Sequence, residues 1–421
     1  MELLTLDNGL RIALQHNDFV RSTAMNLYID CGSRNETESN SGSAHFLEHM
    51  MFKGTENADL VTLNSKMDQM GGQFNAYTSK EHTCVFCHVL KDDVKEALSM
   101  ILEMVTLPVI DKNELETEKG VILEEINMYE DSPEDIAAET LYACMYRDGL
   151  KNPVLGTKES VKAVTVESLK KYREAFYTPD RMVLSVCGNF ENEDVLSVVE
   201  KYISPLKRGL LTPQKEYSSE FFGGIALREK DFEQTQLMIA SESYPAGSEN
   251  RFAMAVLSAI AGGNSSSRLN MRIREELGLA YSIYSGSYNH RGAGAFVITA
   301  GTAHKNQAQV IEETLSIMDI VHRTITPEEI ERVKAQFKAT TIMGHESISA
   351  ACSSAGREIL YRGTYTDIDT ISKRIDEVDY EKVMVAYRDT WNKDLLCLTA
   401  VGKPLSVAEY EALGFKNQSI M

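Results

Sequence analysis

The two halves of this 421-residue chain repeat each other. Tyr387 lies 215 positions after Tyr172, and Gly402 lies 214 positions after Gly188. Each tyrosine belongs to a segment with helical periodicity, and an apolar strand that ends at the glycine follows about ten residues later. A constant offset of about half the chain predicts two copies of one domain. Because strand and helix patterns are mixed within each copy, the predicted fold class is α+β.

The boundary between the copies is expected where the apolar periodicity breaks. Arg208, Thr212, Pro213 and Lys215 interrupt the periodicity around the middle of the chain. We therefore predict a first domain at 1–207, a linker at 208–222 and a second domain at 223–421.

A possible metal motif lies in the first copy only. His45 and His49 are four residues apart, so on a helix their rings lie one above the other, with Glu48 beside the second ring. The order H-x-x-E-H is the signature of the inverted zincins, which bind zinc and have their own catalytic base. A solvated helix face with unrelated roles is the alternative. Apolar neighbours such as Phe46 and Met50 favour a buried helix, in which His and Glu need partners.

The surroundings of this motif support a specialised helix. The segment Ser41-Gly42-Ser43-Ala44 predicts a cap at the start of the helix. The corresponding region of the second copy, residues 252–260, has no histidine. A metal site is therefore expected in the first domain alone.

A catalytic zinc needs a third protein ligand and an open position. The best source is the acidic segment after residue 112, in which Glu118 and Glu125 lie seven apart and hence on one helix face. From the residues alone, a solvated acidic helix is the favoured interpretation of this segment.

The stretch from Glu118 to Glu125, following H-x-x-E-H, resembles the pitrilysin, insulysin and mitochondrial-processing-peptidase family. In that family the metal glutamate lies about 75 residues beyond the second histidine, and Glu125 lies 76 beyond His49. The resemblance implies one zinc ion per chain with His45, His49 and Glu125 as ligands. It also implies that Glu118 supports the ligands from outside the coordination shell.

Other segments are similar to the same family along essentially the whole chain. They are 7–11, 32–34, 51–55, 75–79, 262–269 and 274–281. The last segment implies that Arg274 and Tyr281, seven apart, reach the substrate. Read alone, they are an ordinary surface arginine and an ordinary strand tyrosine.

The segment 73–79 reads as a strand and is expected to receive a peptide by β-addition. Asn75 is the side chain there that we expect to touch substrate, with Phe74 and Ala76 beside it. Main-chain hydrogen bonds would make such binding tolerant of the peptide's side chains.

The family resemblance implies a function as well as a fold. Each domain is expected to be a mainly antiparallel sheet covered by helices on one side, and the chain to be half of a clam-shell chamber that pairs as a homodimer. The implied activity is that of a metalloendopeptidase, in which Glu48 takes a proton from zinc-bound water while Arg274 and Tyr281 stabilise developing charge. The alternative is a non-catalytic homologue that serves as a scaffold or peptide-binding subunit.

Composition limits the partners. A net charge of −19 argues against nucleic acid or an anionic membrane as the main partner. The charge fits cationic substrates, and a role in solubility explains it equally well. No apolar run reaches the ~18 residues of a membrane span, and the first residues do not resemble a secretory signal. Seven cysteines, an odd number, favour reduced thiols and the cytoplasm.

Cys84 and Cys87 form a C-x-x-C pair flanked by histidines, which raises a second zinc site or a redox pair as alternatives. The segment around them is rich in β-branched and aromatic residues and indicates a strand. Residues three apart on a strand face opposite sides, so the two thiols are expected to diverge.

Overall fold

The computed structural model describes residues 1–210 and 217–417 and forms two compact units. The first unit comprises Met1–Asn127, Asn152–Lys215 and Ile342–Thr366, and the second comprises Met128–Lys151, Glu216–Thr341 and Asp367–Met421. Each unit has its own sheet and core. The predicted division at 207 and 223 stays a prediction, and residues 211–216 of the predicted linker lie outside the described residues.

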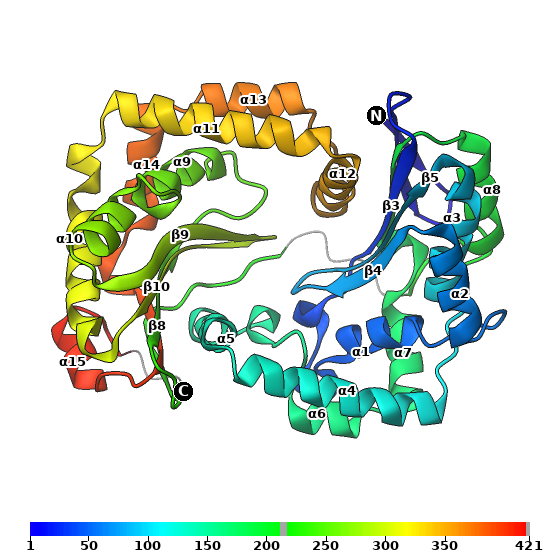
Figure 1. Cartoon of the computed structure of the whole chain (residues 1–421), viewed down its shortest axis with the longest axis horizontal. Helices are drawn as coiled ribbons and strands as arrows, with labels where there is room; N and C mark the ends of the chain where they lie inside the picture. Colours follow the sequence, from blue (N-terminus) through cyan, green and yellow to red (C-terminus); the bar gives the residue numbers. More distant parts are fainter. Residues whose placement is uncertain (211–216, 418–421) are drawn as a thin grey trace. The chain divides into compact units, whose positions relative to one another are not determined.

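The first sheet has six strands, and β4 lies at one edge (Figure 1). Their order is β1 (Glu2–Thr5), β2 (Arg11–His16), β6 (Met182–Gly188), β3 (Ser22–Ile29), β5 (Thr83–Leu90) and β4 (Gln73–Thr78). Only the β2–β6 pair is parallel. The sheet is therefore mixed but mainly antiparallel, and among the described residues no strand pairs with the outer side of the strand predicted to receive peptide.

Helices from the first half of the chain share one core with one face of this sheet. These are α1 (Ser43–Met51), α3 (Val94–Thr106), α7 (Val166–Phe176) and α8 (Asn192–Tyr202). Alternate residues of β3, such as Met25 and Leu27, point into this core, as the two-residue period of a strand requires. The first half also contains α2 (Leu60–Met70), α4 (Lys112–Glu130) and α6 (Lys158–Ala163).

The opposite face of the first sheet is covered by α12 (Ile348–Arg362), which comes from the second half of the sequence. The hydroxyl of Tyr28 donates to the carbonyl of Ser353 at 3.1 Å, and that of Ser185 donates to the carbonyl of Cys352 at 2.9 Å. Gly356 permits this close approach, since a Cβ there would lie 2.5 Å from the ring of Tyr28. The prediction of helices on one side only is thus incomplete.

The second sheet repeats the order of the last five strands of the first, from β2 to β4, and β9 is at the edge position that corresponds to β4 (Figure 1). Its order is β7 (Gly224–Glu229), β11 (Cys397–Gly402), β8 (Thr235–Glu242), β10 (Ala293–Thr302) and β9 (Ala280–His290). Again a single pair, β7–β11, is parallel. The predicted α+β class and the duplication are confirmed.

Helices cover both faces of the second sheet as well. The larger core includes α9 (Arg251–Gly262), α10 (Gln307–Thr324), α11 (Pro327–Glu346), α13 (Ile368–Asp376), α14 (Tyr380–Thr390) and α15 (Val407–Ala412). The other face packs against α5 (Pro133–Met145), where Leu141 shares a core with Met238 and Val297. Each half of the sequence therefore gives one helix to the sheet of the other half.

Cys84 and Cys87 confirm the expected divergence on a strand. Cys84 belongs to the core beneath α12, whereas Cys87 belongs to the core on the opposite face. Burial raises the pKa of both thiols. All seven cysteines are free and buried. Within the described part of the chain, no helix has the length and apolar character needed to cross a membrane.

Candidate metal centre

The helix that bears His45 and His49 starts on a buried carboxylate. α1 begins after Gly42, whose φ of 85° is in the left-handed region, and no side-chain hydroxyl caps it. Glu36 instead accepts hydrogen bonds from the backbone N–H groups of Gly42 at 2.7 Å and Ala44 at 2.8 Å. The N-cap residue, Gly42, lies within the predicted capping segment, but Glu36 from outside that segment supplies the acceptor. A carboxylate stabilises a helix N-terminus because it satisfies unpaired N–H groups and faces the positive end of the dipole.

Burial raises the pKa of Glu36 to about 8, opposed by the N–H donors of Ala44 and Gly42. In an unfolded chain a glutamate has a pKa of about 4.3. The pKa of Glu36 is thus higher in the folded chain than in the unfolded chain. The contribution of Glu36 to stability is therefore fully present below the pKa of the unfolded chain, and it is lost as pH rises through the pKa of the folded chain. We expect the free energy of unfolding of the wild type to fall relative to Glu36→Gln between pH ~4.3 and about 8.

This expectation is measured by urea denaturation of zinc-free protein at intervals across that pH range. Glu38→Gln is the matched control, since Glu38 lies two residues away and is exposed. The difference in free energy of unfolding between Glu38→Gln and the wild type should not show the pH dependence expected for Glu36→Gln. A constant difference between the wild type and Glu36→Gln would contradict the prediction.

Three ligand atoms converge between α1 and α4. The Nε2 atoms of His45 and His49 each lie 3.6 Å from Oε2 of Glu125. One ligand atom from each of the three residues lies within 4.8 Å of the others. The structure thus brings together the two predicted histidines and the predicted glutamate.

This group fits a zinc ion. Tetrahedral zinc with bonds of about 2.0–2.1 Å keeps its ligand atoms roughly 3.3 Å apart, close to the observed spacing. Burial, with the neighbouring His49, lowers the pKa of His45 to about 3, so this ring is in the neutral form that binds metals. Nδ1 of His45 is buried and has no hydrogen-bond partner among the described residues. A metal would bind the other ring nitrogen, Nε2, which faces Glu125.

Glu118 lies directly behind His49. Its Oε2 is 2.9 Å from Nδ1 of His49, and its Oε1 forms an ion pair with Nζ of Lys53. The Glu118 side chain is only 3% exposed. The structure therefore places Glu118 where it can orient a ligand. Lys53 was not predicted as a site residue. Its position four residues after His49 could have indicated that the two side chains lie on the same side of the metal helix.

Glu48 is on the same helix and contacts the predicted substrate strand. Its Oε2 accepts a hydrogen bond from the hydroxyl of Thr78, at the end of β4, at 2.6 Å. Burial raises the pKa of Glu48, while this hydrogen bond opposes the rise. A carboxylate with a raised pKa is suited to exchange protons near neutral pH. Thr78 was not predicted as a site residue.

The other predicted residues of β4 divide between its two faces. Phe74 is half-buried and Ala76 buried, and both pack against the core beneath the sheet. Asn75 is exposed, and Tyr77 on the same face is 38% exposed. In the described part of the chain no strand pairs with the outer side of β4. Backbone groups of this strand are thus free to bind an extended peptide.

Arg274 and Tyr281 lie in the second unit. Arg274 is in a π-helix (Asn270–Glu276), a geometry often found at functional sites, in which the N–H of Leu277 donates to the carbonyl of Arg272. The Arg274 side chain is about half exposed. Tyr281 is 79% exposed near the start of the edge strand β9. Their approach to the metal centre stays a prediction.

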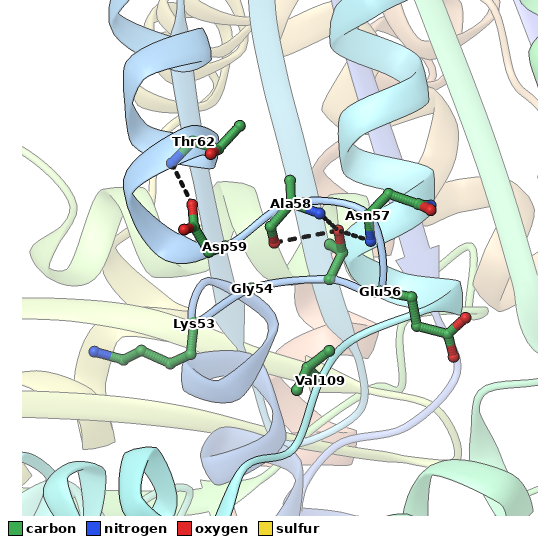
Figure 2. Close-up of a pocket in the computed structure, with 9 residues that line it drawn as sticks. Lys53, Gly54, Glu56, Asn57, Ala58, Asp59, Thr62 and Val109 are labelled. Atoms are coloured by element: carbon green, nitrogen blue, oxygen red, sulfur yellow. Dashed lines mark hydrogen bonds between the residues drawn. The ribbon is translucent and has the colours of Figure 1, made fainter.

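A pocket of about 470 Å³ lies beside the metal helix, in the loop that joins α1 to α2. Figure 2 shows the residues that line it. Within this loop the N–H groups of Asn57 and Ala58 donate to Oγ1 of Thr55. Asp59 caps α2 by accepting from the N–H of Thr62 at 2.8 Å. The loop is consequently well ordered by its own hydrogen bonds.

Comparison with known proteins identifies the family. The family described as Insulinase (Peptidase family M16) matches residues 11–158, and Peptidase M16 inactive domain matches residues 163–337. The uncharacterized zinc protease YmxG of Bacillus subtilis is 36% identical over 93% of this chain and 95% of its own length. The chain belongs to peptidase family M16. The predicted family is thereby confirmed.

Further relatives agree. An uncharacterized zinc protease of Mycobacterium leprae is 35% identical over 92% of this chain and 89% of its own length. The crystal structure of a protease from Helicobacter pylori has a TM-score of 0.86 at 20% identity, covering 96% of this chain and 99% of that one. This last likeness shows that the two proteins share a fold. Because the relatives are zinc proteases, the chain is a zinc metalloprotease of the M16 family, and the predicted cofactor is confirmed.

Proposed function

We propose that this M16 protein is an endopeptidase that hydrolyses peptides or unfolded segments, with His45, His49 and Glu125 as zinc ligands. The observation that supports this most strongly is the convergence of two Nε2 atoms on one carboxylate oxygen, each nitrogen 3.6 Å from that oxygen. Glu48, one residue before His49, adds a carboxylate with a raised pKa. Zinc, when bound, lowers the pKa of coordinated water and polarises the scissile carbonyl.

The residues of the chain then have separate tasks. Glu48 accepts the proton of the attacking water and delivers it to the leaving amine. Glu118 holds Nδ1 of His49, which keeps Nε2 directed at the site. Arg274 and Tyr281 donate hydrogen bonds to the substrate carbonyl or its neighbouring backbone.

The substrate would bind as an added strand on β4. Its free backbone edge supplies hydrogen bonds that do not depend on substrate sequence, and Asn75 supplies an exposed polar side chain. Phe74 and Ala76 contribute backbone groups, since their side chains pack into the core. We further propose that the chain works as a cytoplasmic homodimer that encloses the peptide in a chamber. Seven free cysteines support a reducing compartment.

The test is cleavage of a peptide library, with products mapped by mass spectrometry. We expect internal cleavage of unstructured peptides that disappears when a chelator removes zinc and returns when zinc is restored. Folded proteins whose composition is similar to that of the peptides should resist cleavage. A zinc-loaded protein that cleaves no peptide, even at high concentration, would instead favour the alternative of a non-catalytic scaffold or peptide-binding subunit.

A further inference from the structure

We propose that Lys53 is a positioning residue of the zinc centre, acting through Glu118 on His49. This inference rests on the proposed function, because it takes His49 as a zinc ligand. It starts from the two partners of Glu118. One carboxylate oxygen is 2.9 Å from Nδ1 of His49, and the other forms the ion pair with Nζ of Lys53.

Burial increases the energetic importance of the ion pair between Glu118 and Lys53. The side chain of Glu118 is 3% exposed and that of Lys53 is 23% exposed. A surface ion pair contributes little, but a buried carboxylate that loses its cationic partner is left with an uncompensated charge. Without Lys53, Glu118 would turn toward other donors or toward water, and His49 would lose a fixed acceptor at Nδ1.

The orientation of the His49 ring depends on the carboxylate of Glu118 at Nδ1, and His45 differs from His49 in this respect. Nδ1 of His45 has no hydrogen-bond partner in the described part of the chain, so no acceptor at this nitrogen orients that buried ring. The His49 side chain is 22% exposed and is therefore less confined by packing. A carboxylate on the remote nitrogen fixes both the tautomer and the orientation of such a ring.

The backbone around Lys53 is suited to this task. The N–H of Lys53 donates to the carbonyl of Met50 at 3.1 Å, which ties the residue to the last turn of α1. Immediately afterwards, the carbonyl of Gly54 accepts from Val109 at 3.0 Å, and the N–H of Glu56 donates to Leu107 at 3.0 Å. In Figure 2 the Lys53 side chain extends away from this anchored loop. The ammonium group is thus presented from a rigid support.

The experiment measures the zinc dissociation constant of purified protein by competition with a chromophoric chelator. We expect Lys53→Met to raise this constant about 10- to 100-fold, as loss of an outer partner of a ligand does elsewhere. Lys53→Arg, which keeps the charge, should recover most of the affinity. In a Glu118→Gln background, Lys53→Met should have little further effect, because both changes break one linkage.

Lys66→Met is the matched control, since Lys66 forms an ion pair with Glu96 at 3.2 Å on the surface. Its zinc affinity should equal that of the wild type. If the wild type binds zinc and Lys53→Met binds it equally well, the inference is overturned whatever the effect on thermal stability. If the wild type itself binds no zinc at the site, the proposed function fails. Should Lys53→Met not fold, Lys53→Gln replaces it with the same expected direction.

Discussion

Glu48→Gln is expected to lower kcat/KM for peptide cleavage by about 10³-fold while leaving the zinc content unchanged. Glutamine matches the size of glutamate but cannot accept a proton from water. The three candidate ligands are untouched, and the amide still accepts a hydrogen bond from Thr78, which lies 2.6 Å from the Glu48 carboxylate. The loss should therefore fall on proton transfer and not on metal binding or folding.

The measurement combines kcat/KM on a fluorogenic peptide with zinc content by atomic absorption. Thr78→Val is the comparison variant, because it keeps the carboxylate and removes only its hydrogen-bond donor. We expect it to lose far less activity, roughly tenfold. Retention of a tenth or more of the activity by a zinc-loaded Glu48→Gln protein would show that another group is the base.

Mixtures of two inactive variants are expected to recover about a quarter of the wild-type activity. The variants are Glu48→Gln and Tyr281→Phe, combined by co-expression with different tags. We propose in addition that, in the homodimer, Tyr281 of one subunit serves the metal centre of the other. Half of randomly formed dimers would contain one chain of each kind, and one of their two sites would then have both Glu48 and Tyr281.

A matched control uses Glu48→Gln with Glu125→Gln. Both residues lie in the first unit and belong to one proposed metal centre, so no pairing of these chains produces a complete site. This mixture should stay inactive. If the Tyr281→Phe mixture shows only the summed activity of its two components, Tyr281 does not act across a dimer.

Local patterns predicted the parts of the centre that one helix can present. His45, Glu48 and His49 follow from the helical period, which places residues four apart on one side whatever surrounds them. Glu125 lies 76 positions beyond His49, and no periodicity connects them. Family resemblance indicated Glu125, and the structure places its Oε2 3.6 Å from both Nε2 atoms.

Three contacts of the centre were not predicted from the sequence. Glu36 caps α1 from six residues before Gly42, Thr78 reaches Glu48 from β4, and Lys53 pairs with Glu118 from the loop after α1. Each contact joins residues on different segments. The geometry of these contacts depends on how the segments pack against each other. The pattern of side chains along one segment does not predict that packing.

The sequence by itself determined the α+β class, the duplication and the histidine pair, because strand and helix periodicities and a constant offset of about half the chain are local or repeated signals. Only the tertiary structure decided that α5 and α12 cover the second face of the sheet of the opposite half. It also decided which buried carboxylates support the metal helix. The physical reason is that an apolar helix face specifies burial but not its partner, and a buried charge requires a counterpart that only folding brings near.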